Sequence, residues 1–296
     1  MRPEVVAMPQ QDTGQRAVVR RPAVAGTFYP AEPTELRREL DACFRHPLGP
    51  GAPPDRGAAT PLAIVSPHAG IVYSGPFAAH AYAALGSPTV VVVLGPNHFG
   101  LGADLALSSA SAWRTPLGDV PLDAETTECL RGACPALAVD DRAHAREHSL
   151  ELQVIFLQRA LGGSFGIVPI ALATRQLDAL DLLARGLALA VLERGALLVA
   201  STDLSHYLPQ AEARARDLRL LARAEALDVD GLASLVARGE ATACGAAGLI
   251  AVMAAARALG ARECRLLAYG TSGDTGGPRD SVVGYGALRV ERPAAT

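Results

Sequence analysis

The chain contains no closely spaced cysteine pair of the CxxC type, and its number of cysteines is odd. The five are Cys43, Cys129, Cys134, Cys244 and Cys264. Neither a disulfide framework nor a structural zinc knuckle fits this spacing, because both rely on paired cysteines. We therefore expect a protein of a reducing compartment and predict a cytoplasmic location.

Long apolar runs and basic stripes are also missing. No uninterrupted apolar run reaches the ~20 residues that a membrane-spanning helix needs. The opening residues, MRPEVVAMPQQDTGQR, lack the apolar stretch of a signal peptide. The formal net charge is -3, and the basic residues are scattered rather than aligned to follow phosphates. We expect a soluble protein that binds neither membranes nor nucleic acids.

The first 19 residues differ in character from the rest of the chain. They are rich in polar residues, contain one glycine and two prolines, and show no hydrophobic period. We predict a disordered tail over residues 1–19 and a single α/β domain over residues 20–296. Half of all residues are hydrophobic, which is enough for one large core.

Short apolar runs alternate along the chain with segments of helical period. The runs predict buried strands over 62–66, 89–95, 164–170, 195–201, 264–270 and 281–290. Helices are expected from near Pro33 and over 76–85, 147–161, 176–193, 209–226, 228–238 and 245–259. This alternation predicts a three-layer α/β/α sandwich with a mainly parallel or mixed central sheet.

Three histidines follow the ends of predicted strands. They are His68 in a Pro-His-Ala-Gly turn, His98 in Pro-Asn-His-Phe-Gly, and His206, which stands three residues after Asp203. Loops at the carboxyl ends of parallel strands form the ligand crevice of open α/β sheets. We therefore expect these imidazoles at one edge of the sheet.

Other residues leave two interpretations open. His148 and Glu151 either face the crevice or form a solvated first helical turn, and His144 is predicted on the surface. Cys244 stands at the start of the last long helix, where the helix dipole favours a thiolate. That cysteine is therefore a nucleophile, a metal ligand or a small core residue. Imidazoles with one anionic ligand are typical of iron, copper and zinc sites.

Several motifs in register resemble the signatures of the Memo family. In order, they are RRPAVAGTFYP, SPHAGIVYSG, LGPNHFG, EHSLELQ, STDLSHY, ACGAAG, and YGTSGD followed by SVVGYGAL. Bacterial and archaeal members resemble protein B of the AmmeMemoRadiSam system. That resemblance implies AMMECR-type and radical SAM proteins as partners. The family in turn resembles the LigB-like class III extradiol dioxygenases, which implies a LigB-like fold.

The resemblance assigns roles to particular residues. It implies His68, His98 and Cys244 as metal ligands and His206 as an acid/base residue, with Asp203 as its partner or as an alternative metal ligand. It also implies His148 as a pocket wall and Tyr73 as a hydroxyl at the mouth. The dioxygenases use a carboxylate as third ligand, whereas Cys244 would supply a thiolate, a softer donor that shifts the preference toward iron or copper. We expect Fe(II) first, with copper or zinc as alternatives.

Four functions agree with these residues. The first is a metal-dependent oxidoreductase, and the second is a non-catalytic module that binds a small ligand or a peptide. The third is a protein that holds or delivers metal. The fourth is covalent catalysis by Cys244 with His206 as base, which leaves His68 and His98 without a role.

Overall fold

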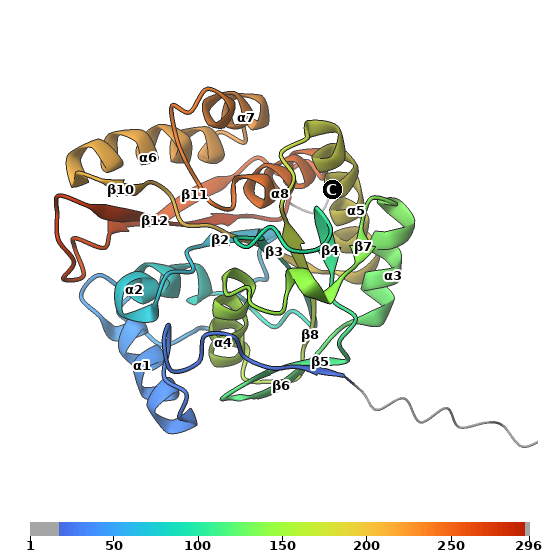
Figure 1. The fold of residues 1–296 in the computed structure, drawn as a ribbon, viewed down its shortest axis with the longest axis horizontal. Coiled ribbons are helices and arrows are strands. Elements are labelled where there is room, and N and C mark those ends of the chain that lie inside the picture. Colours follow the sequence, from blue (N-terminus) through green and yellow to red (C-terminus); the bar gives the residue numbers. More distant parts are fainter. Residues whose placement is uncertain (1–17, 294–296) are drawn as a thin grey trace, which may run out of the picture.

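Four apolar strands form the centre of the sheet (Figure 1). The computed structural model describes residues 18–293. Neighbouring central strands are parallel, and nearly all their residues are buried. Burial on both faces explains why these segments are continuous apolar runs in the sequence. In spatial order the strands are β2 (Ala63–Ser66), β9 (Leu197–Ser201), β3 (Val90–Pro96) and β8 (Gly166–Leu172).

Antiparallel strands extend the sheet at both sides, so the predicted mixed sheet is confirmed. The strand β12 (Val282–Val290) pairs with β2, and β4 (Leu105–Leu107) pairs with β8, both antiparallel. The outer strands are β10 (His206–Leu208) and β11 (Cys264–Thr271), which pair with β12, and β7 (Ala138–Val139), which pairs with β4.

Side-chain alternation along the strands divides the core into two layers. Ile64, Val91 and Val93 pack in one cluster, while Val65 and Val92 pack in the other. The first cluster is covered by α1 (Pro33–Arg45), α2 (Ile71–Tyr82) and α4 (Ser149–Leu161). The second is covered by α3 (Ala124–Ala133), α5 (Leu177–Arg194), α6 (Gln210–Glu225), α7 (Val229–Ala237) and α8 (Ala246–Ala258). The predicted three-layer sandwich is therefore confirmed.

A small second sheet lies beside the main one. Its strands are β1 (Val19–Arg20), β5 (Ala112–Thr115) and β6 (Gly118–Pro121), paired in that order. Residues 1–17 of the predicted tail lie outside the described part of the chain, and Val19, its last residue, belongs to β1. Among the helices of residues 18–293, none has the length and apolar character needed to cross a bilayer.

Candidate metal centre

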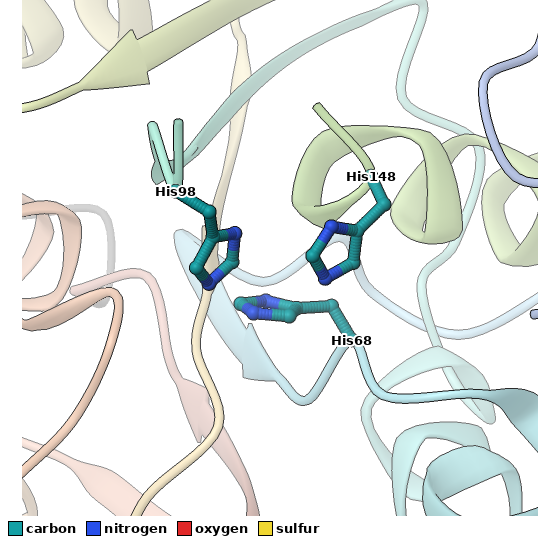
Figure 2. Close-up of side chains that lie close together, drawn as sticks. All are labelled: His68, His98 and His148. Carbon is teal, nitrogen blue, oxygen red and sulfur yellow. The ribbon is translucent and has the colours of Figure 1, made fainter. Parts of the chain in front are cut away.

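Three imidazoles converge at the carboxyl edge of the central strands (Figure 2). His68 follows β2, His98 follows β3, and His148 is the N-cap residue of α4. One ring nitrogen from each lies within 4.8 Å of the other two. The rings of His98 and His148 stack with centroids 4.6 Å apart, and His68 meets both edge-on. Imidazoles at this spacing can hold a metal ion.

The cluster is buried on one side and open on the other. His68 is only 1% exposed, whereas the side chain of His98 is 29% exposed. Burial, with the neighbouring His148 and His98, holds the pKa of His68 well below its usual value. Burial likewise lowers the pKa of His148. The imidazoles of His68 and His148 therefore stay neutral near pH 7, as metal ligands must be.

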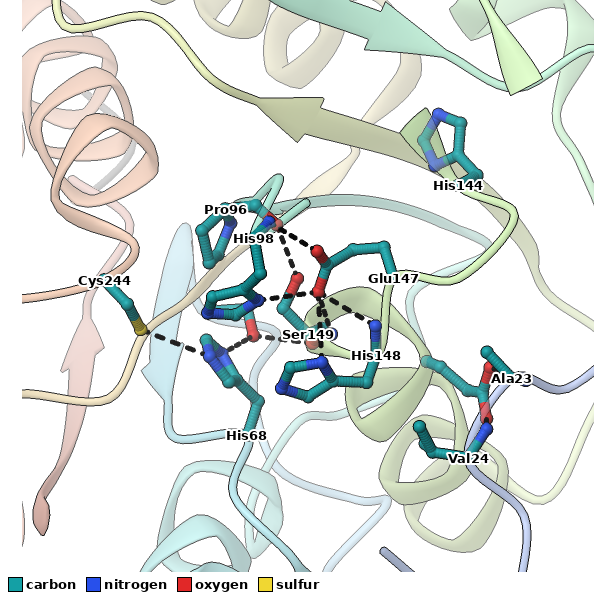
Figure 3. A network of polar contacts seen from close by, with 12 residues as sticks. Ala23, Val24, His68, Pro96, His98, His144, Glu147, His148, Ser149 and Cys244 are labelled. Carbon is teal, nitrogen blue, oxygen red and sulfur yellow. Dashed lines mark hydrogen bonds and ion pairs between the residues drawn. The ribbon is translucent and has the colours of Figure 1, made fainter. Parts of the chain in front are cut away.

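Glu147 fixes the tautomer of His98 (Figure 3). Burial alone would raise the pKa of this carboxyl, but hydrogen bonds from His98 and the Ser149 amide lower the pKa far below its usual range. An ionised carboxylate only accepts hydrogen bonds, so His98 Nδ1, 2.9 Å away, carries the proton. The Nε2 atom of His98 therefore keeps a free lone pair.

Ser201 fixes the tautomer of His68 in the same way. The Ser201 hydroxyl has one proton, which it donates to the Ser149 carbonyl at 2.7 Å. It therefore accepts the remaining hydrogen bonds, from Gln153 Nε2 at 2.7 Å and from His68 Nδ1 at 2.8 Å. Tyr82 donates to the other atom of the Gln153 amide, which fixes the amide orientation. His68 is thus protonated on Nδ1, and its Nε2 atom is unprotonated.

Cys244 touches this cluster through His68. Its sulfur lies 3.2 Å from His68 Nε2 and accepts a hydrogen bond from the Asp203 amide at 3.2 Å. Burial, with the charge of Asp203, raises the pKa of the thiol. The metal-free thiol is therefore neutral, in contrast to the thiolate expected from the helix start. The role of Cys244 as third ligand stays a prediction, because the convergent set contains His148 instead.

The predicted pair of Asp203 and His206 has separate partners. Asp203 accepts the His68 amide at 2.7 Å, and burial raises the pKa of Asp203 to about 6. His206 Nδ1 donates to the Leu204 carbonyl at 2.8 Å, so the neutral tautomer of this ring has its lone pair on Nε2. Asp203 thus orients the turn that carries His68, and a backbone carbonyl orients His206. Tyr73 lies in the first turn of α2 and is 43% exposed.

The chain is similar to known proteins over most of its length. The family described as Memo-like protein matches residues 20–289. The chain belongs to the Memo family. A MEMO1 family protein of Methanopyrus kandleri is 44% identical over 284 residues, covering 92% of this chain and 99% of the relative. One from Aeropyrum pernix is 44% identical over 280 residues, covering 92% and 99%.

A solved structure shares the fold of this Memo-family chain. It is the crystal structure of an uncharacterized Escherichia coli K12 protein, JW3007, with a TM-score of 0.52 and 16% identity. The match covers 78% of this chain and 99% of that chain. At this identity the likeness concerns the fold alone.

Sequence reasoning about this Memo-family chain missed the role of Glu147. The residue begins the EHSLELQ motif, where an acidic residue is expected in a solvated first turn. It is instead fully buried, and it also accepts the amides of His148 and Ser149. A buried ionised carboxylate needs several donors. Two of them are the neighbouring amides, but the other two belong to His98, 49 residues away, and no local pattern reveals that contact.

Glu151 and His144 also differ from the expectations. Glu151 is buried in an ion pair with Arg20 and faces neither the crevice nor solvent. His144, predicted on the surface, is fully buried, and its Nε2 donates to the Ala106 carbonyl at 3.1 Å. It packs edge-on against Trp113. The local charge pattern around residues 141–147 did not reveal that this loop folds inward.

The buried His144 predicts a pH dependence of stability. Burial, together with Arg20, lowers the pKa of His144 to about 4. As the pH falls below 6.5 the unfolded chain takes up a proton that the folded chain refuses, so stability is lost between pH 6.5 and 4. Urea unfolding should show that His144→Gln removes up to roughly 3 kcal/mol of this loss. His46→Gln, at a partly exposed position, is the control, and equal pH profiles for the wild type and His144→Gln would contradict the prediction.

Proposed function

We propose that this chain binds one divalent transition-metal ion through His68, His98 and His148 and acts as a metal-dependent oxidoreductase. The observation that supports the proposal is the convergence of three imidazoles, two of which have their Nδ1 protons committed to Glu147 and Ser201. Such partners behind metal-binding histidines raise ligand basicity and fix ring orientation.

The donor set suits the proposed ion. Imidazole is a ligand for iron, copper and zinc, and three protein ligands leave coordination positions for other molecules. Bound iron or copper would supply one-electron redox chemistry at those positions. We propose iron first because the chain matches the Memo family, whose resemblance to non-haem iron enzymes motivates that choice.

His206 is the proposed proton-handling residue. Its Nδ1 proton is held by the Leu204 carbonyl, so Nε2 can accept a proton. Asp203, three residues before His206, accepts the His68 amide at 2.7 Å, so the segment that leads to His206 contacts the turn that carries His68. His206 would hold a proton beside the centre without being one of its ligands.

Metal binding by His98→Ala tests the proposal. The wild type, loaded anaerobically with Fe(II), Cu(II) or Zn(II) in separate titrations, should bind one equivalent of at least one ion. His98→Ala should bind that ion at least ~10-fold more weakly, because a donor atom is lost. The control is His80→Ala, whose ring bonds the Leu48 carbonyl away from the cluster. Equal affinities of wild type and His98→Ala would refute the proposal.

The partial exposure of His98 favours a second candidate function, the handling of metal. An ion bound beside an exposed ligand can exchange with solvent or with a partner protein, and we retain AMMECR-type and radical SAM proteins as proposed partners. Transfer to a chelator within seconds would support metal handling. An ion retained for hours would favour the oxidoreductase.

A further inference from the structure

We infer that Arg20 is a positioning residue of the metal centre, through the loop that carries Glu147 and His148. The inference rests on the proposed metal site. Arg20 lies in the two-residue strand β1, and the loop carbonyls that it binds are 124 and 127 residues away in the sequence. The guanidinium is nonetheless buried against the loop backbone.

The hydrogen bonds of Arg20 fall on both ends of the loop. Its Nε and Nη2 atoms donate to the His144 carbonyl at 3.2 and 3.0 Å, and Nη2 also donates to the Glu147 carbonyl. One planar group thus holds two carbonyls that are three residues apart. This geometry uses the fixed fork of a guanidinium, which an ammonium group does not have.

Two further contacts keep the guanidinium in place. It lies over the ring of Trp113, 4.3 Å from the centroid, and its Nη1 atom pairs with Glu151. Glu151 is itself held by the amides of Ala23 and Val24 and by the Tyr29 hydroxyl. Because Glu151 belongs to α4, Arg20 ties β1 and the loop to the helix whose N-cap is His148.

Glu147 can orient His98 only while the loop holds its carboxylate in the right position. Its carboxylate reaches His98 with one oxygen on the backbone amide at 2.7 Å and the other on Nδ1 at 2.9 Å. A shift of the Glu147 backbone by a fraction of an ångström would lengthen both bonds. The Nδ1 proton of His98 would then lose its acceptor, and the tautomer that leaves Nε2 free would no longer be favoured.

Arg20→Lys tests the inference, with Arg56→Lys as the matched control. Arg56 also binds a backbone carbonyl of α4, that of Ala160 at 2.8 Å, but at the opposite end of the helix. Arg20→Lys should weaken metal binding ~10–100-fold, as expected for loss of support behind a ligand. Arg56→Lys should stay within about twofold of the wild type, as expected for a contact remote from the ligands. Equal metal affinity of Arg20→Lys and wild type would overturn the inference.

A second readout separates this inference from the metal proposal. In metal-free protein, long-range ¹H–¹⁵N spectra report the tautomer of each histidine, and the signals of His98 are assigned with His98→Ala. Arg20→Lys should reduce the Nδ1-protonated signature of His98, while Arg56→Lys should preserve it. If the wild type binds no metal, the metal proposal fails, and this spectrum still decides the role of Arg20. An unchanged His98 signature in Arg20→Lys would overturn it.

A milder variant covers the case that Arg20→Lys does not fold. Trp113→Phe keeps an aromatic ring under the guanidinium but weakens the cation–π contact by ~0.5–1 kcal/mol. It should shift metal affinity in the same direction by ~2–5-fold, and an affinity equal to that of the wild type would count against the role of Arg20.

Discussion

The double variant His68→Ala/His98→Ala should fold and retain no metal. It removes both imidazoles whose free Nε2 atoms are fixed by buried partners, so the remaining His148 cannot hold an ion alone. We expect a loss of affinity on the order of 1,000-fold or more, since loss of a supporting partner alone costs ~10–100-fold. Elemental analysis of anaerobically purified protein measures the outcome. His46→Ala/His80→Ala is the control, and a double variant that keeps its metal would contradict the prediction.

Two single variants decide whether His148 or Cys244 is the third metal ligand. His148→Ala should weaken metal binding more than Cys244→Ser does, because His148 belongs to the convergent set and the Cys244 thiol is held neutral by burial. A larger loss in Cys244→Ser would instead support the ligand set implied by the family resemblance.

Glu151→Ala should destabilise the folded protein strongly. It leaves the buried Arg20 charge without a counter-charge and removes the acceptor of the Tyr29 hydroxyl. Breaking a buried ion pair on one side costs ~3–5 kcal/mol, measured as the free energy of unfolding in urea. The double variant Arg20→Met/Glu151→Leu should recover much of this loss, because it removes both charges.

A surface ion pair provides the control for Glu151→Ala. Glu212 pairs with Arg216 one turn away on α6, and both side chains are partly exposed. Glu212→Ala should cost at most ~0.5 kcal/mol. If Glu151→Ala and Glu212→Ala lower the free energy of unfolding equally, the buried Arg20–Glu151 pair stabilises the fold no more than a surface pair does.

The central layers of the fold could be predicted from the sequence because burial on both faces leaves a strong local pattern. The runs that became β2, β3, β8 and β9 are continuous apolar segments. Residues 105–139 left no comparable signal, since β4 to β7 have at most four residues and several side chains of β5 to β7 face solvent. Their formation depends on neighbours elsewhere in the chain.

The site was predictable only in part, for a similar reason. The positions of His68 and His98 after strand ends follow from topology, which brings loops after parallel strands together. The partners Glu147 and Ser201 were not predictable, because each acts on an imidazole 49 or more residues away. Long-range hydrogen bonds of this kind have no period in the sequence.

The serine behind His68 has a consequence for proton movement. Ser201 donates its single hydroxyl proton to the Ser149 carbonyl, which cannot transfer a proton further. His68 therefore cannot exchange protons with the protein interior through Ser201. In the proposed oxidoreductase, protons would therefore enter from the solvent side, past the partly exposed His98. The turnover rate of the proposed oxidoreductase should therefore respond to buffer concentration and to deuterium in the solvent.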